Sequence, residues 1–399
     1  MTQEWIHFAF RLFHLIAGIM WIGTSFYFVW MDGSFVPSAR RADPEGGGPG
    51  GTDDGVEGEL HMVHGGFFYR VEKRRPMEMP KLLHWFKYES LLTFISGFFL
   101  MGLVYWSGGA LALMDLTRDH LTQAQAIGVS VGCLVVCWVV YDLVWLLVGR
   151  RAPILALCLT LTGLVGAIYG LCQVFPGRAA FIHVGAMLGT IMVANVWIRI
   201  LPNQRRMIAA SLEGQDPDWA RGLAAKHRSM HNSYMTIPVL MMMVTNHFSF
   251  VFEHPLNWVL LCGLCVVGAS VRHLMITLER GQPATWAIGP LVVALVAIVA
   301  LTRPEARAVD GTPPVAFAEV NQIFQRRCTP CHSSTPTDDV FKAAPGGLTF
   351  DSSEHITSLA SRIRLRVVEA RTMPFANKTG MTDEEREIVR RWVDQGARP

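Results

Sequence analysis

The chain has 399 residues, of which 51% are hydrophobic and 17% are charged. Its apolar runs are too long and too numerous for a soluble core to bury, which excludes a large soluble helical protein. The formal net charge of +3 is small, and it does not suggest nucleic-acid binding.

Eight apolar runs precede residue 303, and each approaches the length of about twenty residues that crosses about 30 Å of hydrocarbon. Because lipid offers no partner for backbone polar groups, each run is predicted to form a helix. The predicted spans cover residues 5–31, 86–107, 123–148, 152–173, 179–200, 233–252, 257–278 and 284–302. The sequence therefore predicts a helical bundle over residues 1–302 that lies in membrane lipid.

Basic residues gather in alternate connections between these spans, which indicates an orientation. The odd-numbered connections carry Arg40, Arg41, Arg70, Lys73, Arg74, Arg75, Lys81, Arg150, Arg151, Arg205, Arg206, Arg221, Lys226, Arg228 and Arg280. The second and fourth connections hold only Arg118 and Arg178, and the sixth holds no basic residue. Odd connections are therefore predicted to be cytoplasmic, with both termini on the periplasmic side of a bacterial inner membrane.

The first span carries polar side chains on one helical face. They recur every three or four residues, at His7, Arg11, His14, Gly18, Trp21, Ser25 and Asp32. Ionisable groups are costly in lipid, so they indicate function by default. His7 and Asp32 are near the ends and could be interfacial. Arg11 and His14 are deeper and are candidate catalytic residues, although packing residues remain an alternative.

The long first connection divides into two parts. Residues 43–58 are rich in Gly, Asp, Glu and Pro, which is typical of a flexible insertion. The second part begins with His61 and His64 and continues through an aromatic run. We expect it to be ordered against the cytoplasmic rim. Two histidines alone are weak support for a metal site.

Later spans add polar residues at two depths. In the predicted topology His183 and His247 lie in the outer half and could converge with His14, although each could also be a hydrogen-bonded core histidine. A second group nearer the cytoplasm contains Glu89, Asp142, Asn195, Arg199, His231, Asn232, Arg272 and His273. Asp142 could form an interior ion pair with Arg199 or Arg272. Because such a pair is structural more often than catalytic, this group ranks second as a candidate site. The cysteines of the spans are predicted to be small core residues without disulfides: Cys133, Cys137, Cys158, Cys172, Cys262 and Cys265.

The C-terminal segment contains Cys328-Thr-Pro-Cys331-His332. The spacing C-x-x-C-H is typical of covalent haem c attachment, with the histidine as proximal iron ligand. Met373, about forty residues downstream, is the candidate second ligand, since a His/Met pair ligates electron-transfer cytochromes c. The alternatives are a redox pair or half of a zinc site.

Two helices are predicted around this motif. Val315 to Arg327 has apolar residues at helical spacing, and Thr382 to Glu385 forms a capping box for a last helix that Gly396 ends. The predicted fold is therefore all-α: a bundle of about eight transmembrane helices at 1–302, a linker at 303–314 and a small cytochrome c domain at 315–399.

Several strings of this sequence resemble one family, the integral-membrane urate oxidases with a fused cytochrome c, also called urate hydroxylases. They are Ala-Gly-Ile-Met-Trp-Ile-Gly-Thr-Ser-Phe-Tyr-Phe-Val-Trp at 17–30, His64-Gly-Gly-Phe-Phe-Tyr, Trp85-Phe-Lys-Tyr-Glu-Ser, Arg228-Ser-Met-His-Asn-Ser-Tyr-Met-Thr-Ile-Pro-Val and Asn246-His247. The resemblance covers nearly the whole chain. It implies oxidation of urate to 5-hydroxyisourate, with electrons passing to the haem c and on to a respiratory-chain acceptor such as a soluble cytochrome c or a terminal oxidase.

The resemblance carries over haem residues only, at Cys328, Cys331, His332 and Met373. From the chemistry of a planar anion we expect Arg11 to bind urate, Trp21 or Phe13 to stack on it, and His14, His183 or His247 to act as base. Because oxygen is not the direct acceptor, no hydrogen peroxide is expected.

Urate gives up two electrons and one haem c accepts one, which leaves two alternatives open. Either the haem turns over twice, or two of His14, His183 and His247 ligate an additional haem b. The alternative function is an electron-transfer subunit that moves electrons from quinol to a cytochrome without acting on a purine.

Overall fold

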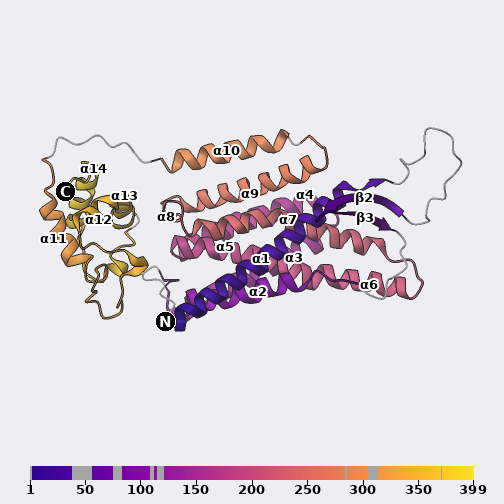
Figure 1. The fold of residues 1–399 in the computed structure, drawn as a ribbon, viewed down its shortest axis with the longest axis horizontal. Coiled ribbons are helices and arrows are strands. Elements are labelled where there is room, and N and C mark those ends of the chain that lie inside the picture. The colour runs from indigo at the N-terminus through magenta and orange to yellow at the C-terminus, as the bar shows by residue number, and fades with distance from the viewer. Residues whose placement is uncertain are drawn as a thin grey trace.

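The computed structural model describes residues 2–37, 56–74, 83–107, 112–114, 121–283, 285–303, 313–369 and 371–399. Long helices form an elongated bundle, a small C-terminal domain lies at one end of it, and a β-hairpin lies at the other (Figure 1). The start of α1 is at the same end as the C-terminal domain. Residues 43–55 of the predicted insertion and 304–312 of the predicted linker lie outside the described residues.

Six helical stretches of the described chain are long and apolar enough to cross a membrane. They contain α1 (Thr2–Ser34), α2 with η2 (Tyr88–Met101, Gly102–Trp106), α3 (Gln123–Leu147), α4 (Pro153–Val174), α5 with η4 and α6 (Gly177–Ala194, Asn195–Ile200, Leu201–Leu212), and α9 (Asn257–Glu279). The other two predicted spans correspond to α7 (Trp219–Thr245) and α10 (Thr285–Leu301). These two helices are not among the six, because the first half of α7 is polar and α10 has only 17 residues.

The sixth predicted span, 233–252, is corrected at both ends. The helix α7 begins at Trp219 and ends at Thr245, and a separate short helix α8 (Ser249–Phe252) follows. Polar residues that the prediction assigned to a cytoplasmic connection, including Arg228, are therefore inside the bundle. The early start follows from Asp218, whose side chain accepts a hydrogen bond from the Ala220 N–H and caps the helix.

The core of the bundle gathers around α5, which packs against α3, α4 and α7. Small residues permit this close approach. A Cβ added at Gly185 would lie 2.9 Å from Met242 of α7, and one at Gly268 of α9 would lie 2.8 Å from Pro238. Such contacts are typical of helices that associate within lipid.

A three-stranded antiparallel sheet corrects the all-α prediction. It contains β1 (Val36–Pro37), β2 (Val56–His64) and β3 (Phe67–Arg74) in the order β1-β2-β3. Gly65 and Gly66 both adopt positive φ, as a two-residue hairpin turn requires. Asp32 at the end of α1 ties this sheet to the bundle, because it accepts hydrogen bonds from Lys73 of β3 at 2.7 Å and Lys226 of α7 at 2.6 Å.

The C-terminal domain contains α11 (Phe317–Arg327), η5 (Pro345–Gly347), α12 (Ser353–Ser358), α13 (Ala360–Ile363), η6 (Arg364–Glu369), η7 (Phe375–Asn377) and α14 (Asp383–Asp394). Val320, Phe324, Val389 and Trp392 are buried in its core. The predicted capping box at Thr382 is confirmed, and Gly396 follows α14 with a φ of 96°.

Candidate functional site

The C-x-x-C-H segment forms a turn at the end of α11. The backbone N–H groups of Cys331 and His332 both donate to the Cys328 carbonyl, at 3.2 and 2.8 Å. Both cysteines are free thiols. Burial raises the pKa of the Cys328 thiol to about 12, whereas a reactive redox cysteine has a lowered pKa. Among the described residues no group of three or more His, Cys, Asp or Glu could hold a metal ion, so a zinc half-site has no partner there.

His332 is held with one ring nitrogen engaged. Its Nδ1 lies 3.0 Å from the Leu348 carbonyl oxygen, and the Phe350 ring packs 5.3 Å from the imidazole. If Nδ1 carries the proton, Nε2 is left as an unprotonated ligand atom. Burial lowers the pKa of His332. The hydrogen bond with the Leu348 carbonyl raises it, and the nearby charges of Arg366 and Arg362 lower it further, so that the pKa lies below its ordinary value. A lowered pKa favours the neutral imidazole, which is the protonation state that iron ligation needs.

The backbone of Met373 is fixed on both sides. Its N–H donates to the Arg366 carbonyl at 3.0 Å, and its own carbonyl accepts from Arg386 at 2.8 Å. Its side chain is packed against the core of the domain. With two free thiols, one oriented imidazole and a thioether, the residues present fit a haem c.

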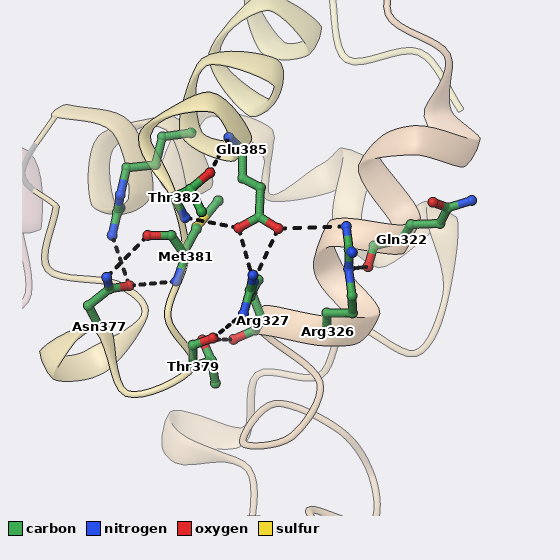
Figure 2. A network of polar contacts seen from close by, with 9 residues as sticks. Gln322, Arg326, Arg327, Asn377, Thr379, Met381, Thr382 and Glu385 are labelled. Atoms are coloured by element: carbon green, nitrogen blue, oxygen red, sulfur yellow. Dashed lines mark hydrogen bonds and ion pairs between the residues drawn. The ribbon is translucent and has the colours of Figure 1, made fainter.

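A polar network joins α11, which leads into the C-x-x-C-H motif, to the loop after Met373 (Figure 2). Glu385 accepts from Arg327 Nε at 2.9 Å and from the Thr382 N–H at 3.0 Å. Arg327 also donates to the Thr379 carbonyl, and Asn377 exchanges hydrogen bonds with the Met381 backbone. The ends of α11 and α14 are thereby held in one arrangement around the motif.

The C-terminal domain contacts the bundle through an ion pair. Arg366 Nη2 lies 3.0 Å from Glu253 Oε1, which follows α8. The Glu253 side chain is only 6% exposed. The Arg366 charge also acts on His332, so the histidine of the motif is within electrostatic range of the residue that makes this ion pair.

The four residues predicted as catalytic occupy different surroundings. His183 on α5 is fully buried, and both its ring nitrogens are engaged, with Ser130 Oγ at 2.6 Å and the Ala179 carbonyl at 2.7 Å. His14 on α1 uses Nδ1 toward the Thr93 carbonyl and Ser96 Oγ of α2, each at 3.0 Å. Arg11 and His247 are exposed.

Within the described chain none of these four side chains hydrogen-bonds to another. Tyr105 lies near two of them: its ring packs 5.5 Å from His183, and it is within electrostatic range of Arg11. His183 has no free ring nitrogen, so it does not fit as a haem b ligand.

Apart from Glu89, the second polar group divides into two clusters. The Asp142 cluster, defined as Tyr141, Asp142, Asn195, Arg199, Arg228, His231 and Asn232, joins α3, η4 and α7. Asp142 pairs with Arg199 at 2.9 Å and with Arg228 at 3.0 Å. The expected pair with Arg199 is thus present, and the pairing with Arg228 was missed. His227 and Arg228 lie four residues, about one helical turn, before His231 and Asn232. This spacing puts Arg228 on the same helical face as Asn232, and it is the sequence signal that could have indicated the pairing.

The Arg272 cluster, defined as Phe26, Ser233, Tyr234, Arg272 and His273, joins α1, α7 and α9. Arg272 Nε donates to Ser233 Oγ at 2.9 Å, and its guanidinium carbon lies 3.6 Å from the centre of the Phe26 ring. Tyr234 Oη lies 2.7 Å from His273 Nδ1. Sequence reasoning missed Phe26, Ser233 and Tyr234, since no local pattern marks them.

A surface groove of about 520 Å³ lies far from these clusters, in the C-terminal domain. Its lining includes Glu354, Thr357 and Ser361, with no aromatic ring and no basic side chain. A carboxylate repels an anion, so this groove does not suit the ligand that the buried arginines would bind.

Comparison with known proteins identifies the bundle. A family model described as "Urate oxidase N-terminal" matches residues 1–303, which is more than half of the chain. No curated protein matches the sequence. No solved structure matches it either.

Proposed function

The chain belongs to the urate oxidase N-terminal family, and we propose that it oxidises urate in a bacterial inner membrane and delivers the electrons to its own C-terminal domain. The overall change is urate plus water to 5-hydroxyisourate, two protons and two electrons. The observation that carries the proposal is the fusion of this family's domain to a C-terminal domain that contains a C-x-x-C-H segment and contacts the bundle through the Arg366–Glu253 ion pair.

The haem c would be held by Cys328, Cys331, His332 and Met373. When bound, it would accept one electron at a time. The protein supplies the rest: an arginine to pair with the urate anion, a base for the proton that leaves with the electrons, and access for the water that adds at C5. Of the predicted bases His14, His183 and His247, His183 fits this role least, because both its ring nitrogens are already engaged.

The orientation is part of the proposal. Lys73 and Lys226 lie at the hairpin end of the bundle, opposite the C-terminal domain (Figure 1). Basic residues favour the cytoplasmic side. We therefore assign the hairpin to the cytoplasm and the C-terminal domain to the periplasm, where a soluble cytochrome c or a terminal oxidase would collect the electrons.

The test uses the purified full chain, without oxygen. Urate should reduce one covalently bound haem per chain, and in air it should yield no stoichiometric hydrogen peroxide. The control is the double variant Cys328→Ser with Cys331→Ser, which should lose the covalent haem and the spectral change together. Reduction by quinol but not by urate would instead identify a quinol-to-cytochrome subunit, and stoichiometric peroxide would contradict the proposed electron path.

A further inference from the structure

Arg272 is a buried charge whose hydrogen-bonding capacity is mostly unused. Its side chain is 0% exposed. Among the described residues only Nε has a partner, Ser233 Oγ at 2.9 Å, whereas Nη1 and Nη2 are buried without a hydrogen bond there. The neighbouring His273 also has a buried ring nitrogen, Nε2, without a partner. Two adjacent residues of α9 thus both have unused polar atoms in the interior.

The missing partner of Arg272 is anionic. Arginine stays protonated in proteins, and an unpaired buried charge costs several kcal/mol unless a counter-charge is present. In the described part of the bundle, the interior arginines Arg199 and Arg228 both pair with Asp142. Within the part of the chain that the structure describes, Arg272 has no such carboxylate: Glu279 acts on it at a distance but is exposed and makes no hydrogen bond to it. A ligand that brings negative charge would complete this site.

The geometry selects a flat ligand with two adjacent acceptors. The guanidinium is 3.6 Å from the Phe26 ring centre, and its Nε is fixed by Ser233, so its plane is held. Its free Nη1 and Nη2 can donate in parallel to two acceptor atoms on one edge of a ligand. The urate anion presents ring nitrogens and carbonyl oxygens side by side in a planar ring.

We infer that urate binds at Arg272, in the Arg272 cluster, and not at the exposed Arg11. This inference rests on the proposed function, because it takes urate as the substrate. Arg11 can be solvated or reach lipid headgroups from the surface, so it does not require a ligand. Arg272 lies fifteen residues from the start of α9, about 22 Å along the helix from the end near the C-terminal domain.

The test measures urate binding separately from turnover. The haem of the purified full chain is first reduced with dithionite, so that bound urate cannot pass on electrons, and urate is then titrated by calorimetry. Arg272→Gln should weaken binding about 100-fold, since two charge-assisted hydrogen bonds are lost. Arg272→Lys should weaken it about tenfold, because the charge stays and the fork is lost. Arg206→Gln, at an exposed position on α6, is the matched control and should leave binding unchanged.

Stability distinguishes a lost ligand contact from misfolding. Without urate, Arg272→Gln should melt at or above the temperature of the unmodified chain, because it removes an unpaired buried charge. Urate should then raise the melting temperature of the unmodified chain and of Arg206→Gln but not that of Arg272→Gln, and inorganic phosphate should have no such effect.

Three results would overturn the inference. They are an unchanged dissociation constant in Arg272→Gln or, should that variant not fold, in Arg272→Lys; loss of binding in Arg11→Gln but not in the Arg272 variants; and equal stabilisation by phosphate, which would identify a general anion site. If the unmodified chain neither binds urate nor is reduced by it, the proposed function fails, and the inference fails with it.

Discussion

The contact between the two domains can be tested through the ion pair between Arg366 and Glu253. Arg366→Gln leaves the Glu253 carboxylate, whose side chain is 6% exposed, without the partner that lies 3.0 Å away. Breaking a fully buried pair from one side costs about 3–5 kcal/mol. Here Arg366 is 26% exposed, and Arg362 and Arg178 still act on Glu253. We therefore expect a loss of about 2 kcal/mol in docking of the domain, or about thirtyfold in the docking equilibrium.

The partner substitution should behave differently. Burial raises the pKa of Glu253 despite the charges of Arg366, Arg362 and Arg178, so its desolvation is not fully offset. Glu253→Gln removes that cost together with the attraction and should lose less than Arg366→Gln. In the double variant the loss should be smaller than the sum of the two single losses.

Hydrogen exchange at the backbone amides of α8 measures this directly, because Glu253 follows that helix. Exchange should be accelerated up to about thirtyfold in Arg366→Gln, less in Glu253→Gln, and should return part of the way in the double variant. Equal acceleration in both single variants, with additive losses, would show that the pair does not join the domains as described. Unchanged exchange in all three would refute the docking contact itself.

Two further predictions concern packing and pH. A Cβ at Gly177 would lie 1.8 Å from the Phe252 carbonyl oxygen, so Gly177→Ala must push α5 from α8. It should lower the free energy of unfolding by about 3 kcal/mol, measured by thermal unfolding in detergent. The control is Gly189→Ala on the same helix, where an added Cβ has nothing within 4 Å; it should be neutral or slightly stabilising. In the C-terminal domain, burial raises the pKa of Glu385, but the Thr382 N–H and Arg327 outweigh it, so the pKa lies below its ordinary 4.5. A carboxyl with a depressed pKa stabilises the fold above its unfolded-state pKa, and that stability is lost as pH falls through the folded-state value. Exchange of the α14 amides should accelerate over that acidic window in the unmodified chain and much less in Glu385→Gln; an identical pH profile in both would contradict the role given to Glu385.

Sequence patterns predicted the features that depend on neighbours along the chain. The apolar runs are long helices, and the capping box at Thr382 starts α14 as expected. The C-x-x-C-H turn likewise needs only five consecutive residues. The ends of α7 were wrong because its first half is polar, and hydropathy does not detect a helix whose polar face is buried against other polar residues. The hairpin of β2 and β3 was also missed, although Gly65 and Gly66 mark its turn.

What the sequence by itself determined, then, is an apolar helical chain with a C-x-x-C-H motif near its C-terminal end. Only the tertiary structure decided which polar groups are satisfied. His183 and Arg272 are both buried and both ionisable, yet His183 has a partner at each ring nitrogen and Arg272 has none at Nη1 or Nη2. Hydrogen bonding depends on distances between helices that are far apart in the chain, and no local spacing encodes those distances.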